Sequence, residues 1–393
     1  MTYKSRLKVK QRESQPVGKA VHFLLIFALF IVANTLLISP ANAEADISDR
    51  IRFYSLTIED GLSQSTVYDI TEDRFGFMWF GTQDGLNRYD GVKFDQLKHV
   101  ASDPKSLVSP TINQLLYDNK DTVWVLTPQG LDGVDTQSLA ITHWTEEIKN
   151  LSSDDELSSE SFQIHSIALS SDNKVLALTK DFLALIEPES GAMTRLSQFD
   201  VFIKEHNVSK FLALNERLYF LEDSCIVSVD MRGRDRFTEC LSSEVVLLEL
   251  LPNQESTEEF FVTGEKGFAV FSTQTANSEP SIQYFDVKDG RKQSPIRVRQ
   301  LLPFKNGYWL ATEAGLKYWD SAENTITVEL YSDYSDPHSI NNDSSMSIWK
   351  SKEGLLWVGS LFGVNYWKSK QDFIHLLKKR EVMNFKENNY YNM

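Results

Sequence analysis

Short apolar runs with an alternating pattern, separated by glycine-rich turns, recur along most of the chain. The clearest example is FGFMWFGTQDGLNRYDGVKF at 75–94, which predicts three short strands joined by two tight turns. Aromatic and β-branched residues are typical of strands, and glycine is favoured where an antiparallel turn needs a positive φ. One such unit cannot bury its own apolar face, so it needs copies elsewhere in the chain.

Six further copies follow with varying fidelity. They are NKDTVWVLTPQGLDGVD (119–135), NKVLALTKDFLALIE (173–187), NERLYFLEDSCIVSVD (215–230), TEEFFVTGEKGFAVF (257–271), KNGYWLATEAGLKYWD (305–320) and KEGLLWVGSLFGVNYW (352–367). The mean spacing is about 46 residues, and this constancy predicts a structural role for the residues that recur. Those residues are Trp79, Gly81, Gly85, Leu86, Trp124, Gly130, Trp309, Gly315, Trp357, Gly359 and Gly363.

An alternating run precedes each copy, such as TVYDITED at 66–73, and a further run such as KFDQLK at 93–98 follows most of them. Four short antiparallel strands per unit, repeated about every 40–50 residues, are typical of a β-propeller. A tandem β-sandwich does not require the same aromatic-glycine unit seven times. Helical solenoids are excluded, because stripes with a 3.6-residue period are absent after residue 44.

The sequence therefore predicts an all-β fold, a seven-bladed β-propeller of four-stranded antiparallel blades over residues 44–377. The blade cores are expected near 66–98, 111–144, 161–197, 209–240, 245–287, 297–331 and 344–377. An open ring would leave an unpaired strand edge, which promotes aggregation. We expect the spare run RFYSLT (52–57) to complete the seventh blade, beside FIHLL (373–377) or in its place.

The first 43 residues have the pattern of an export signal. A basic leader precedes an almost wholly apolar run at 21–38, and Ser39-Pro40 then breaks any helix. Ala41 and Ala43 form the small-x-small pattern of a cleavage site, which predicts cleavage after Ala43 and a periplasmic body. The alternative is an uncleaved inner-membrane anchor, because about 18 apolar residues can just span a bilayer.

Charge narrows the choice of partners for the exported body. The whole chain has a formal net charge of −15, to which the leader contributes +5, so the body carries about −20. Such a body repels nucleic acid and anionic membranes, so no nucleic acid is expected as a partner. Surface acids also keep a protein soluble without any specific function.

A resemblance to a known family rests on GLSQSTVYDITEDRFGFMWFGTQDGLNRYDG at 61–91. This run closely resembles the repeats of the two-component regulator propeller family, and the linkers DPKSL (103–107) and DPHSI (336–340) resemble its inter-blade connections. The likeness covers roughly 51–376, although the third to fifth units lack the central Trp and most of the Gly-Leu turn.

The resemblance implies the amino-terminal periplasmic sensor of a hybrid histidine kinase or diguanylate cyclase. In that family a second propeller, a small β-sandwich, a transmembrane helix and the cytoplasmic output domain typically follow. The sequence contains no recognisable counterpart of these parts. The stretch 378–393 is polar, lacks the repeat and is expected to be a disordered or out-of-frame tail. A truncated gene product is the expected origin of the chain.

No motif predicts catalysis, a cofactor or a metal. The sequence contains no G-x-S-x-G elbow, no H-E-x-x-H pair and no phosphate-binding G-x-x-x-x-G-K. Its histidines show no metal-ligand spacing. No catalytic, cofactor-binding or metal-binding residue is therefore assigned, and no ligand-binding residue is either.

Acidic residues near strand ends are the strongest candidates for catalytic chemistry. Asp69, Asp73 and Asp118 lie on or after inner strands, where a propeller glycosidase would place its carboxylates. Strand-end and turn roles explain them more simply, since Asp readily bonds its own backbone. The set Asp84, Asn87 and Asp90 fails the spacing of a calcium loop, and turn-forming roles are expected for all three.

Two cysteines and four tryptophans complete the candidates. The turn DMRGRD (230–235) places Cys225 and Cys240 opposite each other across one hairpin, so a disulfide is expected unless a bulge separates them. Trp144, Trp319, Trp349 and Trp367 vary in position between units. They are either packing residues or exposed platforms on which sugars could stack.

Together these features predict a periplasmic ligand-sensing or interaction propeller, without catalysis of its own. The ligand is unknown, and a glycan or oligosaccharide, a neighbouring propeller and a homodimer partner are the candidates. The alternatives are an exported propeller glycosidase or lyase, and a free-standing scaffold that docks proteins.

Overall fold

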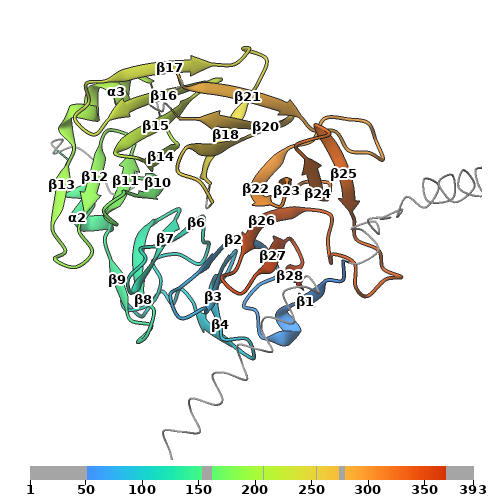
Figure 1. The fold of residues 1–393 in the computed structure, drawn as a ribbon. Coiled ribbons are helices and arrows are strands. Elements are labelled where there is room, and N and C mark those ends of the chain that lie inside the picture. The colour runs from blue at the N-terminus through green and yellow to red at the C-terminus, as the bar shows by residue number, and fades with distance from the viewer. Residues whose placement is uncertain (1–50, 153–161, 207, 254, 274–278, 369–393) are drawn as a thin grey trace, which may run out of the picture. The chain divides into compact units, whose positions relative to one another are not determined.

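Seven four-stranded antiparallel sheets stand around a common centre in the computed structural model of the chain (Figure 1). The structure describes residues 51–152, 162–206, 208–253, 255–273 and 279–368. Each sheet extends from an inner strand, near the middle of the ring, to an outer strand at its rim. The prediction of a seven-bladed β-propeller with four-stranded antiparallel blades is confirmed.

The blades follow one another in chain order. The first three contain β2 (Val67–Glu72), β3 (Met78–Thr82), β4 (Gly85–Tyr89) and β5 (Phe94–Leu97); β6 (Gln114–Tyr117), β7 (Thr122–Thr127), β8 (Gly130–Asp135) and β9 (Ile141–His143); and β10 (Ile164–Leu169), β11 (Val175–Thr179), β12 (Leu183–Ile186) and β13 (Met193–Arg195). The next three contain β14 (Phe211–Leu214), β15 (Arg217–Glu222), β16 (Cys225–Asp230) and β17 (Arg236–Cys240); β18 (Leu247–Pro252), β19 (Glu259–Gly264), β20 (Gly267–Ser272) and β21 (Ser281–Asp286); and β22 (Val298–Phe304), β23 (Gly307–Thr312), β24 (Gly315–Asp320) and β25 (Thr325–Leu330). The seventh contains β26 (Ser345–Lys350), β27 (Leu355–Ser360), β28 (Gly363–Lys368) and β1 (Tyr54–Leu56).

Short helices interrupt the all-β pattern that the sequence predicts. Helix α2 (Thr145–Lys149) follows the second blade, and α3 (Asp200–His206) follows the third blade after the 3-10 turn η3 (Ser197–Phe199). Each α-helix buries one isoleucine, Ile148 in α2 and Ile203 in α3. Helices of one or two turns are too short to show a 3.6-residue stripe, so the sequence pattern missed them.

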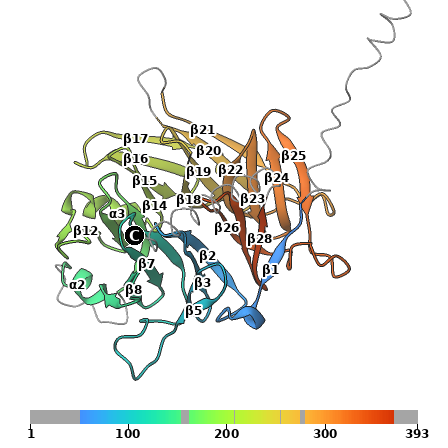
Figure 2. The same cartoon turned by 60° about the horizontal axis from the view of Figure 1, so that its bottom comes forward.

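The outer strand of the seventh blade comes from the beginning of the described chain. Strand β1 pairs with β28, with Tyr54 opposite Tyr366 and Leu56 opposite Val364 (Figure 2). The 3-10 turn η2 (Ile58–Asp60) follows it. The prediction that 52–57 completes the ring is confirmed. The export signal at 1–43, the FIHLL run and the tail at 378–393 lie outside the described residues.

Buried aromatic side chains on the middle strands join neighbouring blades. Trp79, Trp124 and Trp309 have no exposed surface. Between the fourth and fifth blades, the ring centroids of Tyr219 and Phe260 lie 4.7 Å apart. Burial of such a side chain contributes roughly 1.5–3 kcal/mol. The cores of the blades are therefore shared with their neighbours, and the ring is stable only as a whole.

The turn between the second and third strands of the first blade needs a residue with a positive φ. Gly85 adopts a φ of +107°, and a Cβ on it would lie 2.6 Å from the carbonyl oxygen of Leu97. Thr82 Oγ1 donates a hydrogen bond to the Gly85 carbonyl. In the third blade Phe182 replaces the glycine, and Thr179 Oγ1 still donates to the Phe182 carbonyl. The third blade therefore keeps the hydrogen bond of this turn although its sequence lacks the glycine of the repeat.

In the first two blades the indole of the repeat tryptophan has a buried partner. Trp79 Nε1 donates to Asp73 Oδ2 at 2.9 Å, and Trp124 Nε1 donates to Asp118 Oδ2 at 3.4 Å. Both carboxylates are buried and also accept backbone N–H groups of the turn that follows them. Asp73 and Asp118 are thus turn residues that also anchor an indole.

Trp-to-Phe substitutions at two equivalent positions test this anchor. Trp309 Nε1 is buried without a hydrogen-bond acceptor among the described residues, and Phe304 occupies the position of Asp73. We expect Trp79→Phe to cost about 2 kcal/mol more unfolding free energy than Trp309→Phe, because it leaves a buried carboxylate short of a donor. Urea denaturation of both variants measures the difference, and equal costs would contradict the prediction.

Three linkers enter their blades in the same way. A buried Leu or Ile is followed by a residue whose N–H donates to a buried side chain on the third strand. The pairs are Ser63 to Asn87, Val108 to Asp132 and Asn341 to Asn365. Asn87 is therefore not the turn residue that the sequence predicts, because it lies within β4 and fixes the linker that precedes its blade.

Asp132 differs from its two asparagine equivalents, because a carboxylate has no N–H group to donate. His143 on β9 meets Asp132 Oδ1 with its Nδ1 at 2.6 Å and the Pro104 carbonyl oxygen with its Nε2 at 2.8 Å. Both ring nitrogens face acceptors, so the imidazolium form fits this site. Burial lowers the pKa of His143, but these bonds outweigh it and raise the pKa above its ordinary value. The linker at 103–107 is thus held by an ion pair.

Candidate functional site

Polar side chains on the inner strands, or directly before one in the case of Lys210, share one position that we call the inner-strand belt. In five blades a β-bulge immediately precedes this position, and bulges re-aim the side chains beside them. The inner strands surround the middle of the ring (Figure 1), so the belt joins polar groups from all seven blades. Its members are Asp69, Gln114, Ser166, Lys210, Glu249, Gln300 and Ser347.

Hydrogen bonds between belt residues and neighbouring inner strands cross the boundaries between blades. Gln300 Oε1 accepts the N–H of Ile348, and Gln300 Nε2 donates to Asp69 Oδ1 at 3.3 Å. Asp69 Oδ2 in turn accepts the N–H of Leu115 at 2.7 Å. This chain links the sixth, seventh, first and second blades, and it therefore spans the point where the ring closes.

Two further contacts extend the belt around the ring. The Gln114 amide bonds both the N–H and the carbonyl of Ile167, at 3.1 Å and 2.9 Å. Lys210 Nζ lies 2.7 Å from Glu249 Oε2, which joins the fourth and fifth blades by an ion pair. The belt therefore fixes the inner strands relative to one another and presents charges of both signs near the middle of the ring.

Asp69 is the belt residue whose protonation is most strongly perturbed. Burial raises the pKa of Asp69 to about 6, although hydrogen bonds from Leu115, Ile70 and Gln300 act in the opposite direction. The strand-end or turn role that the sequence predicts for Asp69 is wrong, because this residue lies inside β2 and forms hydrogen bonds with two other blades. The available signal was a charged residue between Tyr68 and Ile70, within a predicted strand.

The residues that define the repeat do not converge on a site. Trp79, Trp124, Trp309 and Trp357 lie on the second strand of four different blades, and Gly85, Gly130, Gly315 and Gly363 lie at the turns that follow. Among the variable tryptophans, Trp319 and Trp367 are buried, whereas Trp144 and Trp349 are half-buried. None of these four presents a fully exposed ring on which a sugar could stack.

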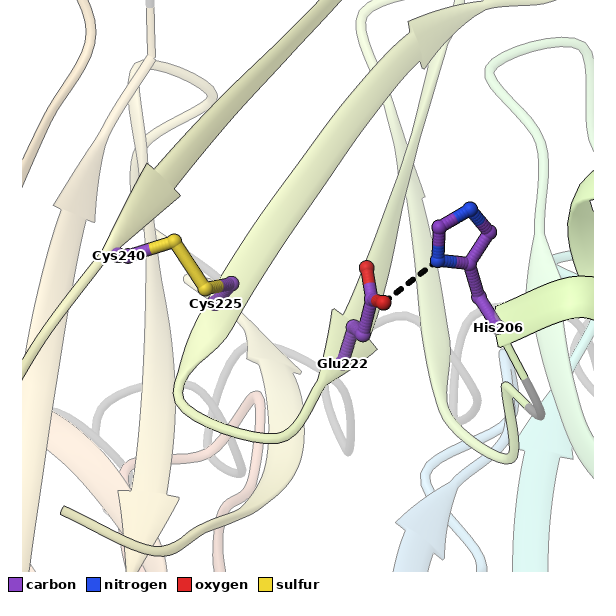
Figure 3. The surroundings of a disulfide bond; sticks show 4 residues. All are labelled: His206, Glu222, Cys225 and Cys240. Atoms are coloured by element: carbon purple, nitrogen blue, oxygen red, sulfur yellow. Dashed lines mark hydrogen bonds and ion pairs between the residues drawn. A yellow bond between two sulfur atoms is a disulfide. The ribbon is translucent and has the colours of Figure 1, made fainter. Parts of the chain in front are cut away.

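A disulfide joins the two cysteines at the rim of the fourth blade (Figure 3). Cys225 on β16 and Cys240 on β17 are opposed in register, with Cα atoms 4.1 Å apart. On the neighbouring strand of the same blade, Glu222 Oε1 bonds His206 Nδ1 of α3 at 2.5 Å (Figure 3). These contacts fix the outer hairpin and helix of this blade.

The described part of the chain has neither a candidate metal centre nor a candidate membrane-spanning helix. It contains no group of three or more His, Cys, Asp or Glu side chains arranged to hold a metal ion. It also contains no helix that is long and apolar enough to cross a membrane.

The closed ring of seven blades, tied by its belt, defines the class as a seven-bladed repeat propeller. Residues 61–84 match the family model described as two component regulator propeller. The resemblance to this family that the sequence predicts is confirmed.

Known proteins share the repeat or the fold. Histidine kinase P4 of Formosa agariphila is 47% identical over 55 residues, which are 14% of this chain and 4% of that protein. The extracellular domain of the putative hybrid two component system BT3049 from B. thetaiotaomicron has a TM-score of 0.61 at 19% identity, with 81% of this chain and 42% of that chain covered. A streptogramin B lyase has a TM-score of 0.59 at 12% identity, with 81% and 98% covered. The chain thus spans under half the length of both signalling proteins, and the structural likenesses show the propeller fold.

Proposed function

We propose that this chain is the extracytoplasmic sensor propeller of a two-component or diguanylate-cyclase receptor, and that it binds a ligand without transforming it. The observation that carries the proposal is the family repeat at 61–84 within a closed seven-bladed ring. The leader at 1–43 and the acidic body support a periplasmic location. A glycan or oligosaccharide is the ligand class that we put forward.

The ring would act as a rigid frame for recognition. Its blades share their cores and its inner strands are bonded across blade boundaries, so the frame resists deformation when a ligand binds. Loops on such a frame supply specificity. In a complete receptor, binding would shift the population of dimer arrangements and so the activity of the output domain.

An exported propeller lyase or glycosidase is the second candidate. It is favoured by the raised pKa of Asp69, about 6, because a general acid or base works best with a pKa near the operating pH. The lyase among the structural neighbours shows that this fold can carry an enzyme. Asp69 is therefore the residue on which the two proposals differ.

Thermal-shift measurements against a panel of oligosaccharides, each followed by product analysis, distinguish the two candidates. We expect a melting temperature that rises by a few degrees with at least one glycan, with no product formed. Asp69→Asn should leave binding detectable. Turnover that Asp69→Asn abolishes would establish the enzyme instead, and a chain that forms a stable homodimer but binds no glycan would favour a protein-docking scaffold.

A further inference from the structure

The beginning of the sixth blade's inner strand differs from those of the other six. Arg297 and Arg299 flank the buried Val298 just before the belt position. At the same point in the other blades the flanking pairs contain no Asp, Glu, Lys or Arg. The described residues at these positions are Thr66/Tyr68, Thr111/Asn113, Gln163/His165, Ser209, Val246/Leu248 and Ser344/Met346. Two adjacent guanidinium groups are therefore a feature of this blade and not of the repeat.

The two arginines lack partners for part of their hydrogen-bonding capacity. The Nε atoms of both are buried and have no acceptor among the described residues. Arg297 Nη1 approaches Glu265 Oε1 at 3.7 Å, whereas the side chain of Arg299 makes no hydrogen bond or ion pair with a described residue. A buried donor without an acceptor costs about 1–3 kcal/mol, and more when it is charged. The Nη groups of Arg299 are not among these buried atoms, so a bound anion can reach them.

The surroundings of the pair limit the charge that such an anion can carry. Burial and the charge of Arg297 lower the pKa of Arg299, while Glu265 and Glu313 act in the opposite direction. Both glutamates belong to turns between second and third strands, Glu265 in the fifth blade and Glu313 in the sixth. Two cations and two acids leave the group close to neutral. A dianion such as sulfate is therefore disfavoured relative to a monoanionic carboxylate.

We propose that Arg297 and Arg299 bind the carboxylate of an acidic sugar, a uronic acid unit within an oligosaccharide. The two Nη groups at the end of a guanidinium can donate in parallel to the two oxygens of a carboxylate. The carboxylates of Glu265 and Glu313 can accept hydrogen bonds from sugar hydroxyls beside it. This assignment rests on the proposed function, because it names the glycan class that the sensor recognises.

Isothermal titration of the whole chain with tri-galacturonic acid and with its neutral counterpart, galactotriose, tests the proposal. We expect the acidic trisaccharide to bind and the neutral one to bind at least about tenfold more weakly. Arg299→Gln should weaken binding of the acid by about tenfold, which corresponds to 1.4 kcal/mol. Arg299→Lys should keep part of the affinity, because lysine retains the charge without the fork. Glu265→Gln should tighten binding, because it frees Arg297 from its ion pair.

Equal binding of both trisaccharides, or unchanged binding by Arg299→Gln, overturns this inference and leaves the proposed glycan sensor standing. An equal response to sodium sulfate also overturns it, because no carboxylate is then recognised. If neither trisaccharide nor any other member of the glycan panel binds, both proposals fail. Arg299→Gln is expected to keep the melting temperature of the parent, because it removes a cation without a partner. If Arg299→Gln lowers the melting temperature, Arg297→Gln provides a second variant, because the Arg297 side chain is partly exposed.

Discussion

Replacing Phe53 by alanine is expected to lower the free energy of unfolding by about 3–5 kcal/mol. Phe53 is 2% exposed and directly precedes β1, the strand that closes the ring. Its N–H donates to the His338 carbonyl at 2.9 Å, in the linker before the seventh blade. Loss of this side chain removes the apolar anchor of a strand only three residues long, so the whole ring loses its closure.

Phe75→Ala is the matched control, because it makes the same chemical change at a side chain that is 51% exposed. It should change stability by less than about 0.5 kcal/mol. Equilibrium denaturation with guanidinium, followed by tryptophan fluorescence, compares the two variants. If Phe53→Ala costs no more than Phe75→Ala, the closing strand does not depend on this anchor.

The number of blades and their strand order could be predicted because the repeat records a packing requirement. Each unit must supply a large buried side chain on its second strand and a tight turn after it, as Trp79 and Gly85 do in the first blade. The middle blades meet the same requirement with other residues. Tyr219 and Phe261 are buried at the positions where the fourth and fifth blades lack the tryptophan, so the units can be recognised by the position of a buried aromatic side chain although the residue type changes.

The inner-strand belt could not be predicted in the same way, because its contacts depend on register between blades. Asp69 bonds Leu115 and Gln300, which lie 46 and 231 residues away in the sequence. No local pattern encodes such a pairing, and a one-residue bulge decides where the side chain points. A charged residue inside a strand was visible in the sequence, but the partners that determine its role were not.

The same limit applies to the side chains that hold the linkers. Asn87 looks like a turn residue in the sequence, yet Asn87 and its equivalent Asn365 each use the side-chain carbonyl oxygen to fix a linker 24 residues earlier. The amide suits this position because it also donates, to Ser63 Oγ in one case and to Asn341 Oδ1 in the other. Asp132 occupies the same position but has no N–H group to donate, and its carboxylate bonds His143 on the next strand instead.

The ion pair between Asp132 and His143 predicts that substitutions of these two residues have non-additive effects on the free energy of unfolding. His143→Ala should cost about 2–3 kcal/mol of unfolding free energy at pH 6, because it leaves a fully buried carboxylate without its counter-ion. Asp132→Asn should change stability little, because an amide can accept from Val108 and donate to a neutral His143. Adding His143→Ala to Asp132→Asn should then cost under about 1 kcal/mol. A double-mutant cycle measured by urea denaturation gives the coupling.

The stabilisation from this ion pair should decrease as the pH rises. The pKa of His143 is raised above its ordinary 6.5, an effect to which Glu147 adds. The folded protein therefore holds this proton more tightly than the unfolded chain. Its contribution to stability is complete below about pH 6.5 and is lost as the pH rises through the raised pKa. Asp132→Asn should remove this loss, so a wild-type and a variant that lose stability equally above pH 6.5 would contradict the ion pair.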